Sequence, residues 1–296
     1  MLRRSLESLL AQTYPHWVAT VYDDAPHDGA AGVVEAVGDR RIHYRKNAIR
    51  LGAARNIDQC FDPCSTRSGS FGSLLEDDNF FLPDFFRHAA EVIQVNNAKI
   101  LLMNQLIYEE AQGRYIDGET TRGGWFREGS ISPHELMAVA LFNEGISNGG
   151  LIWKLDAGLD LRVGPSVAET GLHEICRSIL IEEPFTFVAV PLVVWTSMEK
   201  TFSARAAETN AIISRGNQSI RSFILEYYQD SVFERAHRIA AVFGKRKDLA
   251  KTLAYCGFLR LALKTSRRPE VIEQYLKGTV RRLLTADPCR EFLSRH

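Results

Sequence analysis

Apolar and polar positions along residues 1–200 follow two different spacings. Runs rich in β-branched and aromatic residues predict strands, and stretches with apolar residues three or four positions apart predict helices. The predicted strands are residues 18–24, 41–46, 71–78, 99–110, 150–155 and 185–195, and the predicted helices are residues 5–12, 52–61, 132–142 and a helix that Pro83 opens. This alternation indicates an α/β domain with a mixed, mostly parallel sheet flanked by helices.

After about residue 200 the strand signals stop. Ile220, Phe223, Ile224, Tyr227 and Tyr228 fall on one face of a helix, and the segments that follow repeat this spacing. We therefore expect two domains, an α/β domain over residues 1–203 and a C-terminal all-helical subdomain over residues 204–296.

Charge divides the chain at about the same place. Residues 201–296 hold 18 of the 36 Lys and Arg residues and 9 of the 36 Asp and Glu residues, so this segment carries +9 and residues 1–200 carry −9. The asymmetry supports two segments with different roles. A basic helical tail can pack on the acidic domain, form a homodimer contact, bind an anionic acceptor or lie on a membrane surface.

Composition places the chain among ordinary globular proteins, with 45% hydrophobic and 24% charged residues. No stretch approaches the length of apolar sequence that a membrane span needs, and the first residues do not resemble a signal peptide. Of the five cysteines only Cys60 and Cys64 are close in sequence, and no second pair or histidine cluster accompanies them. Reduced thiols in a cytoplasmic protein fit better than a zinc site.

Two acidic clusters end two of the predicted strands, Asp23–Asp24 and Glu76–Asp77–Asp78. In open α/β sheets, ligands bind at the carboxyl ends of strands. Crowded carboxylates need a counter-charge, which Mg²⁺ or Mn²⁺ can supply, and nucleotide diphosphates carry the same cations. The structural alternative is that these acids cap the helices that follow or lie on a solvated loop.

Four segments in register resemble family 2 glycosyltransferases with the GT-A fold. SLESLLAQTYPHW is similar to the first helix of the family, and VATVYDDAPHDG to its second strand and acidic loop. RIHYRKNAIRLGAARNIDQCF is similar to the third strand and the helix start after it, and LLEDDNFFLPDFF to the Asp-x-Asp element. The resemblance covers roughly residues 3–200. It implies inverting sugar transfer from a nucleotide diphosphate sugar, with UDP as the expected nucleotide and Mn²⁺ or Mg²⁺ as cofactor.

The resemblance also implies roles for individual residues. Asp24 would accept a hydrogen bond from the nucleotide base, with Asp23 beside it, and Asp77 would face ribose or sugar hydroxyls. Asp78 would hold the metal, and Glu76 would support it. Arg55 and Asn56 would lie near the nucleotide, although capping of a helix start and a surface ion pair explain them as well.

The general base is placed less directly. The stretch VAETGLHEICRSI matches the family segment that carries it, but Thr170 stands where the family has the second acid. Glu169 is the first candidate, and Glu174 and His173 follow it. Glu169 is equally explained as an acid at a helix N-terminus.

Acceptor contacts are expected from two loops. One contains Trp125, which could stack on a sugar face or simply anchor the packing of its loop. The other contains Asn148.

The chain departs from the family pattern in two places. The central strand that precedes the first helix in the family is missing before Met1, so either the natural start lies upstream, which we favour, or another element fills the gap. In the loop after PLVVW, Glu199 and Lys200 replace the expected Arg and His, and they could contact the metal and diphosphate or be ordinary surface residues.

Two functions remain open from the sequence. The first is an active glycosyltransferase in the cytoplasm or at the inner face of the membrane, with no nucleic-acid partner. The second is a non-catalytic nucleotide-sugar-binding or interaction module with a degenerate GT-A fold. A nucleotidyltransferase would need a Gly-rich phosphate loop, which the chain lacks.

Overall fold

The structure is a computed structural model, which describes residues 1–27, 29–62, 69–142, 144–197 and 204–296. The chain forms two compact units. Unit 1 comprises residues 1–131, 147–162 and 184–200, and unit 2 comprises residues 132–146, 163–183 and 201–296. The C-terminal helices therefore share a unit with two segments that the sequence-based division at residue 203 assigned to the α/β domain. Glu199 and Lys200 lie outside the described residues.

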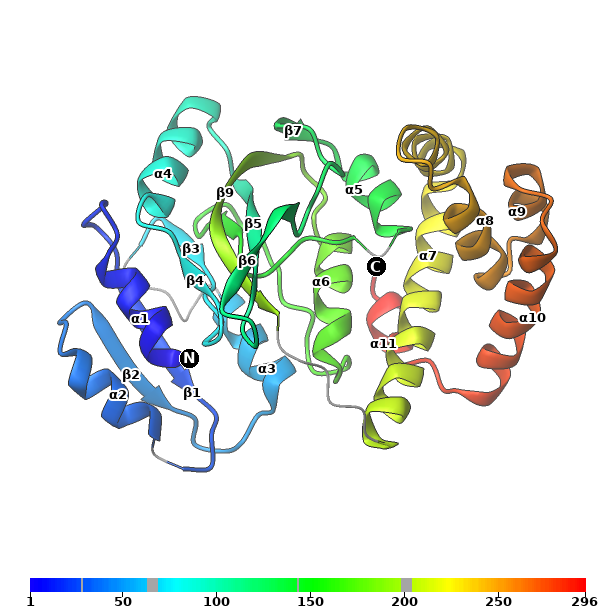
Figure 1. The fold of residues 1–296 in the computed structure, drawn as a ribbon. Coiled ribbons are helices and arrows are strands. Elements are labelled where there is room, and N and C mark those ends of the chain that lie inside the picture. Colours follow the sequence, from blue (N-terminus) through cyan, green and yellow to red (C-terminus); the bar gives the residue numbers. More distant parts are fainter. Residues whose placement is uncertain (28, 63–68, 143, 198–203) are drawn as a thin grey trace. The chain divides into compact units, whose positions relative to one another are not determined.

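Unit 1 contains two sheets. Its helices are α1 (Leu2–Leu10), α2 (Gly29–Val37), α3 (Ala53–Asp58), the 3₁₀ turn η1 (Gln59–Phe61) and α4 (Phe85–Asn96). Its strands are β1 (Ala19–Asp23), β2 (Ile42–Lys46), β3 (Phe71–Ser73), β4 (Phe80–Phe81), β5 (Ile100–Glu109), β6 (Arg114–Thr120), β7 (Gly129–Ile131), β8 (Leu151–Lys154) and β9 (Phe185–Ser197). Strands β1 and β2 form a parallel pair, and α1 and α2 pack against each other beside it (Figure 1).

In the described parts of the chain, the larger sheet has seven strands in the order β3-β8-β5-β9-β4, with β6 added to β5 and β7 added to β9. The expected mixed α/β architecture is confirmed. The expectation that most pairs are parallel is wrong, because only β1–β2 and β5–β9 are parallel among the seven described pairings. Strand β5 turns directly into β6, and such a hairpin connection makes an antiparallel pair.

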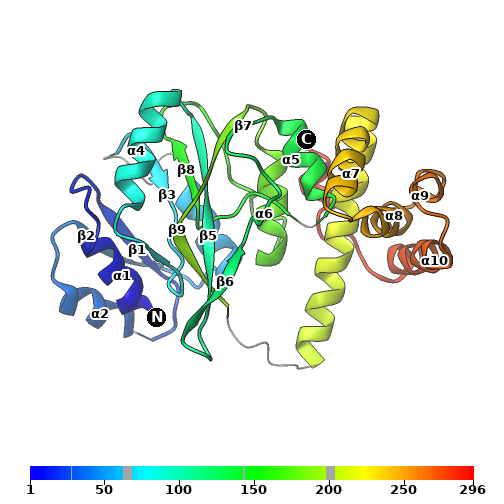
Figure 2. The ribbon, with the colours of Figure 1, turned by 45° about the horizontal axis from the view of Figure 1, so that its top comes forward.

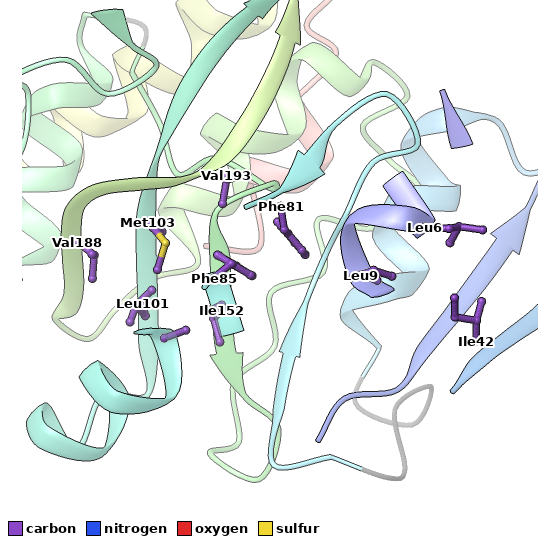
Figure 3. Packing of buried hydrophobic residues seen from close by; sticks show 11 residues of the cluster. Leu6, Leu9, Ile42, Phe81, Phe85, Leu101, Met103, Ile152, Val188 and Val193 are labelled. Carbon is purple, nitrogen blue, oxygen red and sulfur yellow. The ribbon is translucent and has the colours of Figure 1, made fainter. Parts of the chain in front are cut away.

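The core of unit 1 lies between the larger sheet and its helices. Phe81 and Phe85 stack with ring centroids 4.0 Å apart, beside Leu101 and Met103 of β5. Figure 3 shows Leu6 and Leu9 of α1 in the same cluster, so α1 is held to the sheet by the apolar face that its leucine spacing predicts.

The two sheets of unit 1 are not joined. Among the described residues, β1 pairs only with β2, and β3 is an edge strand that pairs only with β8. No other described strand occupies the place that the resemblance assigns to the missing central strand. A pocket of about 720 Å³ lies there instead, lined by residues of both β1 and β3.

Unit 2 is helical. Its elements are α5 (Pro133–Ala140), α6 (Thr170–Ile179), α7 (Ala204–Val242), α8 (Arg246–Tyr255), α9 (Leu259–Thr265), α10 (Pro269–Leu284) and α11 (Arg290–Leu293). Helix α7 is interrupted at Gln229, where φ is +46°. Figure 2 shows α8, α9 and α10 packed together. The five helices after residue 203 agree with the predicted helical tail, and none of the helices in the described parts of the chain is long and apolar enough to cross a membrane.

The start of α5 shows how directly sequence can fix a boundary. The hydroxyl of Ser132 accepts a hydrogen bond from the N–H of Glu135, and the carboxylate of Glu135 accepts one from the N–H of Ser132. Pro133 lies in the first turn of the helix, where a backbone N–H would have no partner within the helix, so the absence of this group in proline costs no hydrogen bond. This is the reciprocal cap that the Ser-x-x-Glu pattern predicts.

Candidate functional site

The pocket in unit 1 brings both acidic clusters together. Its volume is about 720 Å³, and its walls come from α1, β1, α3, β3 and the loop after β3. Six residues that the resemblance selected or supports line it: Asp23, Asp24, Asn56, Glu76, Asp77 and Asp78. Arg55 is exposed and is not among the described residues of the lining.

Asp23 lies at the end of β1, and its carboxylate accepts hydrogen bonds from β2 and from the loop after β1. Its Oδ2 accepts hydrogen bonds from the hydroxyl of Tyr44 (2.7 Å) and from Nζ of Lys46 (3.0 Å), and its Oδ1 accepts one from the N–H of Ala25 (2.9 Å). Burial works to raise the pKa of Asp23, but these hydrogen bonds and the charge of Lys46 outweigh it and lower the pKa. Asp23 is therefore an ionised residue that fixes the β1–β2 pair.

Asp24 shapes the loop that enters α3. Its Oδ1 accepts hydrogen bonds from the N–H of Leu51 (2.7 Å) and from Nδ2 of Asn47 (2.9 Å), and its Oδ2 accepts one from the N–H of Gly52 (2.7 Å). Partial burial opposes ionisation, but these bonds outweigh it and lower the pKa of Asp24. A carboxylate offers about four acceptor positions, so these three bonds leave Asp24 capacity for one more donor.

Asn56 belongs to the same network. Its Oδ1 accepts hydrogen bonds from Nδ2 of Asn47 (2.8 Å) and Nε2 of Gln59 (2.6 Å), and its Nδ2 donates to the carbonyl oxygen of Tyr22 (3.3 Å). Asn56 thus ties α3 to β1, and it shapes the pocket wall.

The acidic loop after β3 is clamped from α1. The hydroxyl of Ser5 lies within hydrogen-bonding distance of the carbonyl oxygens of Asp77 (2.8 Å) and Asn79 (2.6 Å). The guanidinium of Arg4 donates to the carbonyl oxygen of Asp78 (3.0 Å) and to the carboxylate of Glu110 (2.8 Å). Side chains of α1 therefore contact three successive carbonyl groups of the loop, and the side chains of Asp77 and Asp78 line the pocket.

A second set of hydrogen bonds connects the acidic loop after β3 to β9. Nδ2 of Asn79 donates to the carboxylate of Glu76 (2.8 Å), and Oδ1 of Asn79 accepts from the N–H of Thr196 in β9 (2.8 Å). The hydroxyl of Thr196 also donates to the carbonyl oxygen of Asp78 (2.6 Å). Through Asn79, the carboxylate of Glu76 is therefore linked to β9.

Asp78 has an electrostatic environment that opposes ionisation. Its burial raises its pKa most, the negative charge of Asp77 raises it further, and Glu110 adds a smaller effect in the same direction. The charge of Arg4 offsets only part of this. A cation placed between Asp77 and Asp78 would remove the repulsion.

Asp77 and Asp78 are the residues of the pocket that could hold a divalent cation. Within the described residues, no group of three or more His, Cys, Asp and Glu side chains could enclose a metal ion. Mg²⁺ usually binds through one or two carboxylates and completes its shell with water and substrate phosphate oxygens. Asp78 with Asp77 is such a donor set, whereas the carboxylate of Glu76 already accepts from Asn79.

The candidate bases lie in unit 2, around the start of α6. Glu169 is the N-cap residue, and in the described structure its side chain makes no capping hydrogen bond. His173 is only 1% exposed, and its Nε2 lies 2.8 Å from the carbonyl oxygen of Val167. Glu174 lies one turn into the helix and is half-buried. The burial of His173 favours a structural role over proton transfer to a substrate.

The two acceptor candidates belong to unit 1 and are placed differently. Trp125 is half-buried in the turn after β6, where its backbone N–H donates to the carbonyl oxygen of Arg122 (2.9 Å). Asn148 is buried just before β8, and its backbone carbonyl oxygen accepts a hydrogen bond from the backbone N–H of Leu151 (3.2 Å). Only Trp125 keeps part of its side chain accessible.

Two residues that line the pocket and one that holds its acidic loop were not predicted from the sequence. Arg50 and Tyr22 line the pocket, and Arg4 holds the acidic loop. Arg50 could have been found as the cation two positions before Gly52, at the entrance to α3. No sequence signal distinguishes Arg4 from Arg3, because only the docking of α1 decides which of the two faces the loop.

Comparisons with known proteins identify a family and a fold. The family model for glycosyl transferase family 2 matches residues 1–147. A search of curated proteins found no match. The fold is similar to TarS from S. aureus, residues 1–349, in complex with UDP (13% identity, TM-score 0.56, covering 95% of this chain and 84% of that chain). The complex of the same fragment with UDP-GlcNAc is equally similar (13% identity, TM-score 0.56, 95% and 85% covered).

The longer TarS structure is similar at 11% identity and a TM-score of 0.56, covering 99% of this chain and 52% of that chain. At these identities the likeness to TarS shows the fold. The family match covers the acidic clusters, α1 and the helix start at Gly52, which are the parts that form the pocket. The N-terminal half of the chain belongs to glycosyl transferase family 2, and the protein is a family 2 glycosyltransferase with a GT-A fold.

Proposed function

We propose that this glycosyltransferase moves a sugar from a UDP-sugar to an acceptor hydroxyl, with inversion at the anomeric carbon. The observation that carries the proposal is the convergence of Asp24, Asp77 and Asp78 on one pocket of about 720 Å³. The choice of UDP is supported by the TarS structures, which hold UDP and UDP-GlcNAc in the same fold.

Different residues of the pocket would bind different parts of the nucleotide sugar. Asp24 has capacity for one more hydrogen bond, which a donor group of the nucleotide base can fill. Asp77 is exposed and can accept from ribose or sugar hydroxyls, and Arg50 offers positive charge to the diphosphate. Asp78 with Asp77 would hold Mn²⁺ or Mg²⁺, which supplies charge stabilisation to the leaving diphosphate when bound.

Proton removal from the acceptor needs a base, and Glu169 is the best candidate. It is half-buried at the start of α6, and its carboxylate is not used to cap that helix in the described structure. A positioned carboxylate can take the proton as the acceptor oxygen attacks the anomeric carbon. Trp125 is proposed to contact the acceptor.

We place the protein in the cytoplasm, because the described cysteines are free thiols. No feature of the pocket calls for a nucleic-acid partner. The basic tail supports contact with a membrane or a second copy.

The proposal is tested by UDP-sugar turnover with Mn²⁺. The wild-type protein should release UDP from one UDP-sugar, and Asp78→Asn should lower the rate about a hundredfold or more. Asp117→Asn is the matched control, since Asp117 is an exposed carboxylate on β6 outside the pocket. NMR of the first product from an α-linked donor should show a β linkage. An α linkage would exclude inversion, and UDP binding without turnover of any donor would contradict the proposal.

A further inference from the structure

Helix α10 carries an apolar stripe on its exposed side. The stripe consists of five residues with large exposed fractions: Ile272 (44%), Leu276 (59%), Val280 (52%), Leu283 (79%) and Leu284 (80%). Their spacing of three or four positions puts them along one side of the helix. Single exposed apolar residues are normal on protein surfaces, but a continuous row on one helix marks an interaction site.

The opposite side of α10 is fixed inside unit 2. Val271 and Gly278 are buried, and a Cβ atom on Gly278 would come within 2.0 Å of the carbonyl oxygen of Tyr255 in α8. Nε2 of Gln218 donates to the carbonyl oxygen of Gly278 (3.0 Å). This close approach sets the rotation of α10, so the apolar stripe faces away from the helices that pack against it.

The surroundings of the apolar stripe are cationic. Residues 243–296 contain 13 Lys and Arg residues and 5 Asp and Glu residues. Lys264, Arg267 and Arg268 are exposed just before α10, and Lys277 is exposed on the helix itself. A second copy of the chain would bring two such cationic segments together. An anionic surface complements them instead.

We propose that α10 docks on the anionic surface of a lipid membrane. The apolar stripe would lie at the boundary of headgroups and acyl chains, and the cations around it would lie among the headgroups. The helix lies on the membrane and does not cross it. This inference does not depend on the sugar-transfer proposal, because it uses no residue of the pocket.

The test is binding to vesicles. Vesicles with about 30% phosphatidylserine in phosphatidylcholine, at about 50 mM salt, should bind the full chain, and pure phosphatidylcholine vesicles should bind it at least about tenfold more weakly. Salt at about 500 mM should weaken the binding, since the Debye length shortens. The variant Leu276→Ser/Leu283→Ser/Leu284→Ser should lose at least about tenfold in partitioning. The double variant Ile49→Ser/Val95→Ser, which removes two exposed apolar residues of unit 1, is the matched control and should bind like the wild type.

A second variant separates charge from apolar contact. Lys264→Gln/Arg267→Gln/Lys277→Gln should reduce binding to the anionic vesicles several-fold and leave the weak binding to phosphatidylcholine unchanged. Circular dichroism should show the same helix content for all variants, because the changed side chains are exposed. The absence of binding to anionic vesicles at low salt would overturn the proposal. The proposal would also be overturned if sedimentation velocity showed a dimer of the wild type, the triple serine variant were monomeric, and neither protein bound vesicles.

Discussion

The hydroxyl of Ser5 lies 2.8 Å from the carbonyl oxygen of Asp77, although the two residues are 72 positions apart. Through this contact the first helix positions the carboxylates proposed to hold the donor and its cation. The same hydroxyl reaches the carbonyl oxygen of Asn79, and Arg4 reaches that of Asp78. The loop geometry therefore depends on a helix that supplies no proposed ligand of its own.

Ser5→Ala should weaken both stability and donor binding. The hydroxyl of Ser5 has a single proton, so the substitution removes the donor of one of the two carbonyl groups that it reaches, which costs about 1–3 kcal/mol in the free energy of unfolding. Urea denaturation measures the first effect, and calorimetric titration with UDP and Mn²⁺ measures the second. Ser294→Ala is the matched control, because its hydroxyl donates to the carbonyl oxygen of Glu291 on an exposed turn of unit 2. Equal stability of Ser5→Ala and the wild type would show that the clamp is dispensable.

Asp78→Asn should stabilise the metal-free protein at neutral pH while it removes activity. Burial and Asp77 raise the pKa of Asp78, so the folded state binds the proton more tightly than the unfolded state does. The resulting stabilisation is complete below the unfolded pKa and is lost as pH rises through the raised folded pKa. Above the folded pKa, the ionised side chain of Asp78 lowers the free energy of unfolding, whereas the neutral side chain of Asn does not. Thermal unfolding at pH 7 without divalent cations checks this, and a lower melting temperature for Asp78→Asn would contradict it.

Mn²⁺ should act differently on the two proteins. With UDP present, Mn²⁺ should raise the melting temperature of the wild type and have a much smaller effect on Asp78→Asn, because a ligand that binds only the folded state stabilises it. The Asp117→Asn control should respond like the wild type. An equal shift in Asp78→Asn and the wild type would place the cation elsewhere.

Asp24→Ala should loosen the loop that leads into α3. The N–H groups of Leu51 and Gly52 would lose their acceptor, at about 1–3 kcal/mol for each one left unsatisfied. In the wild type, the lowered pKa of Asp24 means that its stabilisation is present above the unfolded pKa and is lost as pH falls through the folded pKa. The stability difference between wild type and variant should therefore shrink in strong acid. Urea titrations at pH 7 and pH 3 would measure it.

Glu169→Gln should lower kcat and leave the affinity for the donor unchanged. A lost general base costs about a hundredfold to ten-thousandfold in rate. Single-turnover kinetics with a saturating donor measures the chemical step, and UDP titration measures binding. Glu174→Gln is the comparison on the same helix. If Glu174→Gln alone lost the rate, the base would be Glu174 instead.

Gly278→Ala should destabilise unit 2. The added methyl group would lie 2.0 Å from the carbonyl oxygen of Tyr255, so the helices must move apart, and overpacking of this kind costs about 1–3 kcal/mol. Gly29→Ala at the start of α2 is the matched control, since no atom of the described residues lies within 4 Å of its added Cβ. The control should be neutral or slightly stabilising. Equal melting temperatures for the two variants would contradict the close packing of α10 on α8.

The sequence predicted those parts of the fold that local rules determine. The capping box at Ser132, the apolar strand that became β5 and the amphipathic tail were all found, because each is set by residues near one another in sequence. The balance of parallel and antiparallel pairs was not, because strand direction depends on how distant segments assemble. The clustering of Asp24 and Asp78 in one pocket agrees with the resemblance, whereas the anchoring role of Asp23 and the burial of His173 needed coordinates.

The placement of Asp24 and Asp78 has a thermodynamic consequence. Asp24 lies at the end of the β1–β2 pair, and Asp78 lies in a loop of the seven-stranded sheet. Because Asp24 directly follows β1 and Asp78 lies in the loop between β3 and β4, a donor that contacts both would link the two sheets. Donor binding and the local folding of β1–β2 would then be coupled, so part of the donor's intrinsic affinity would be spent on ordering its own site.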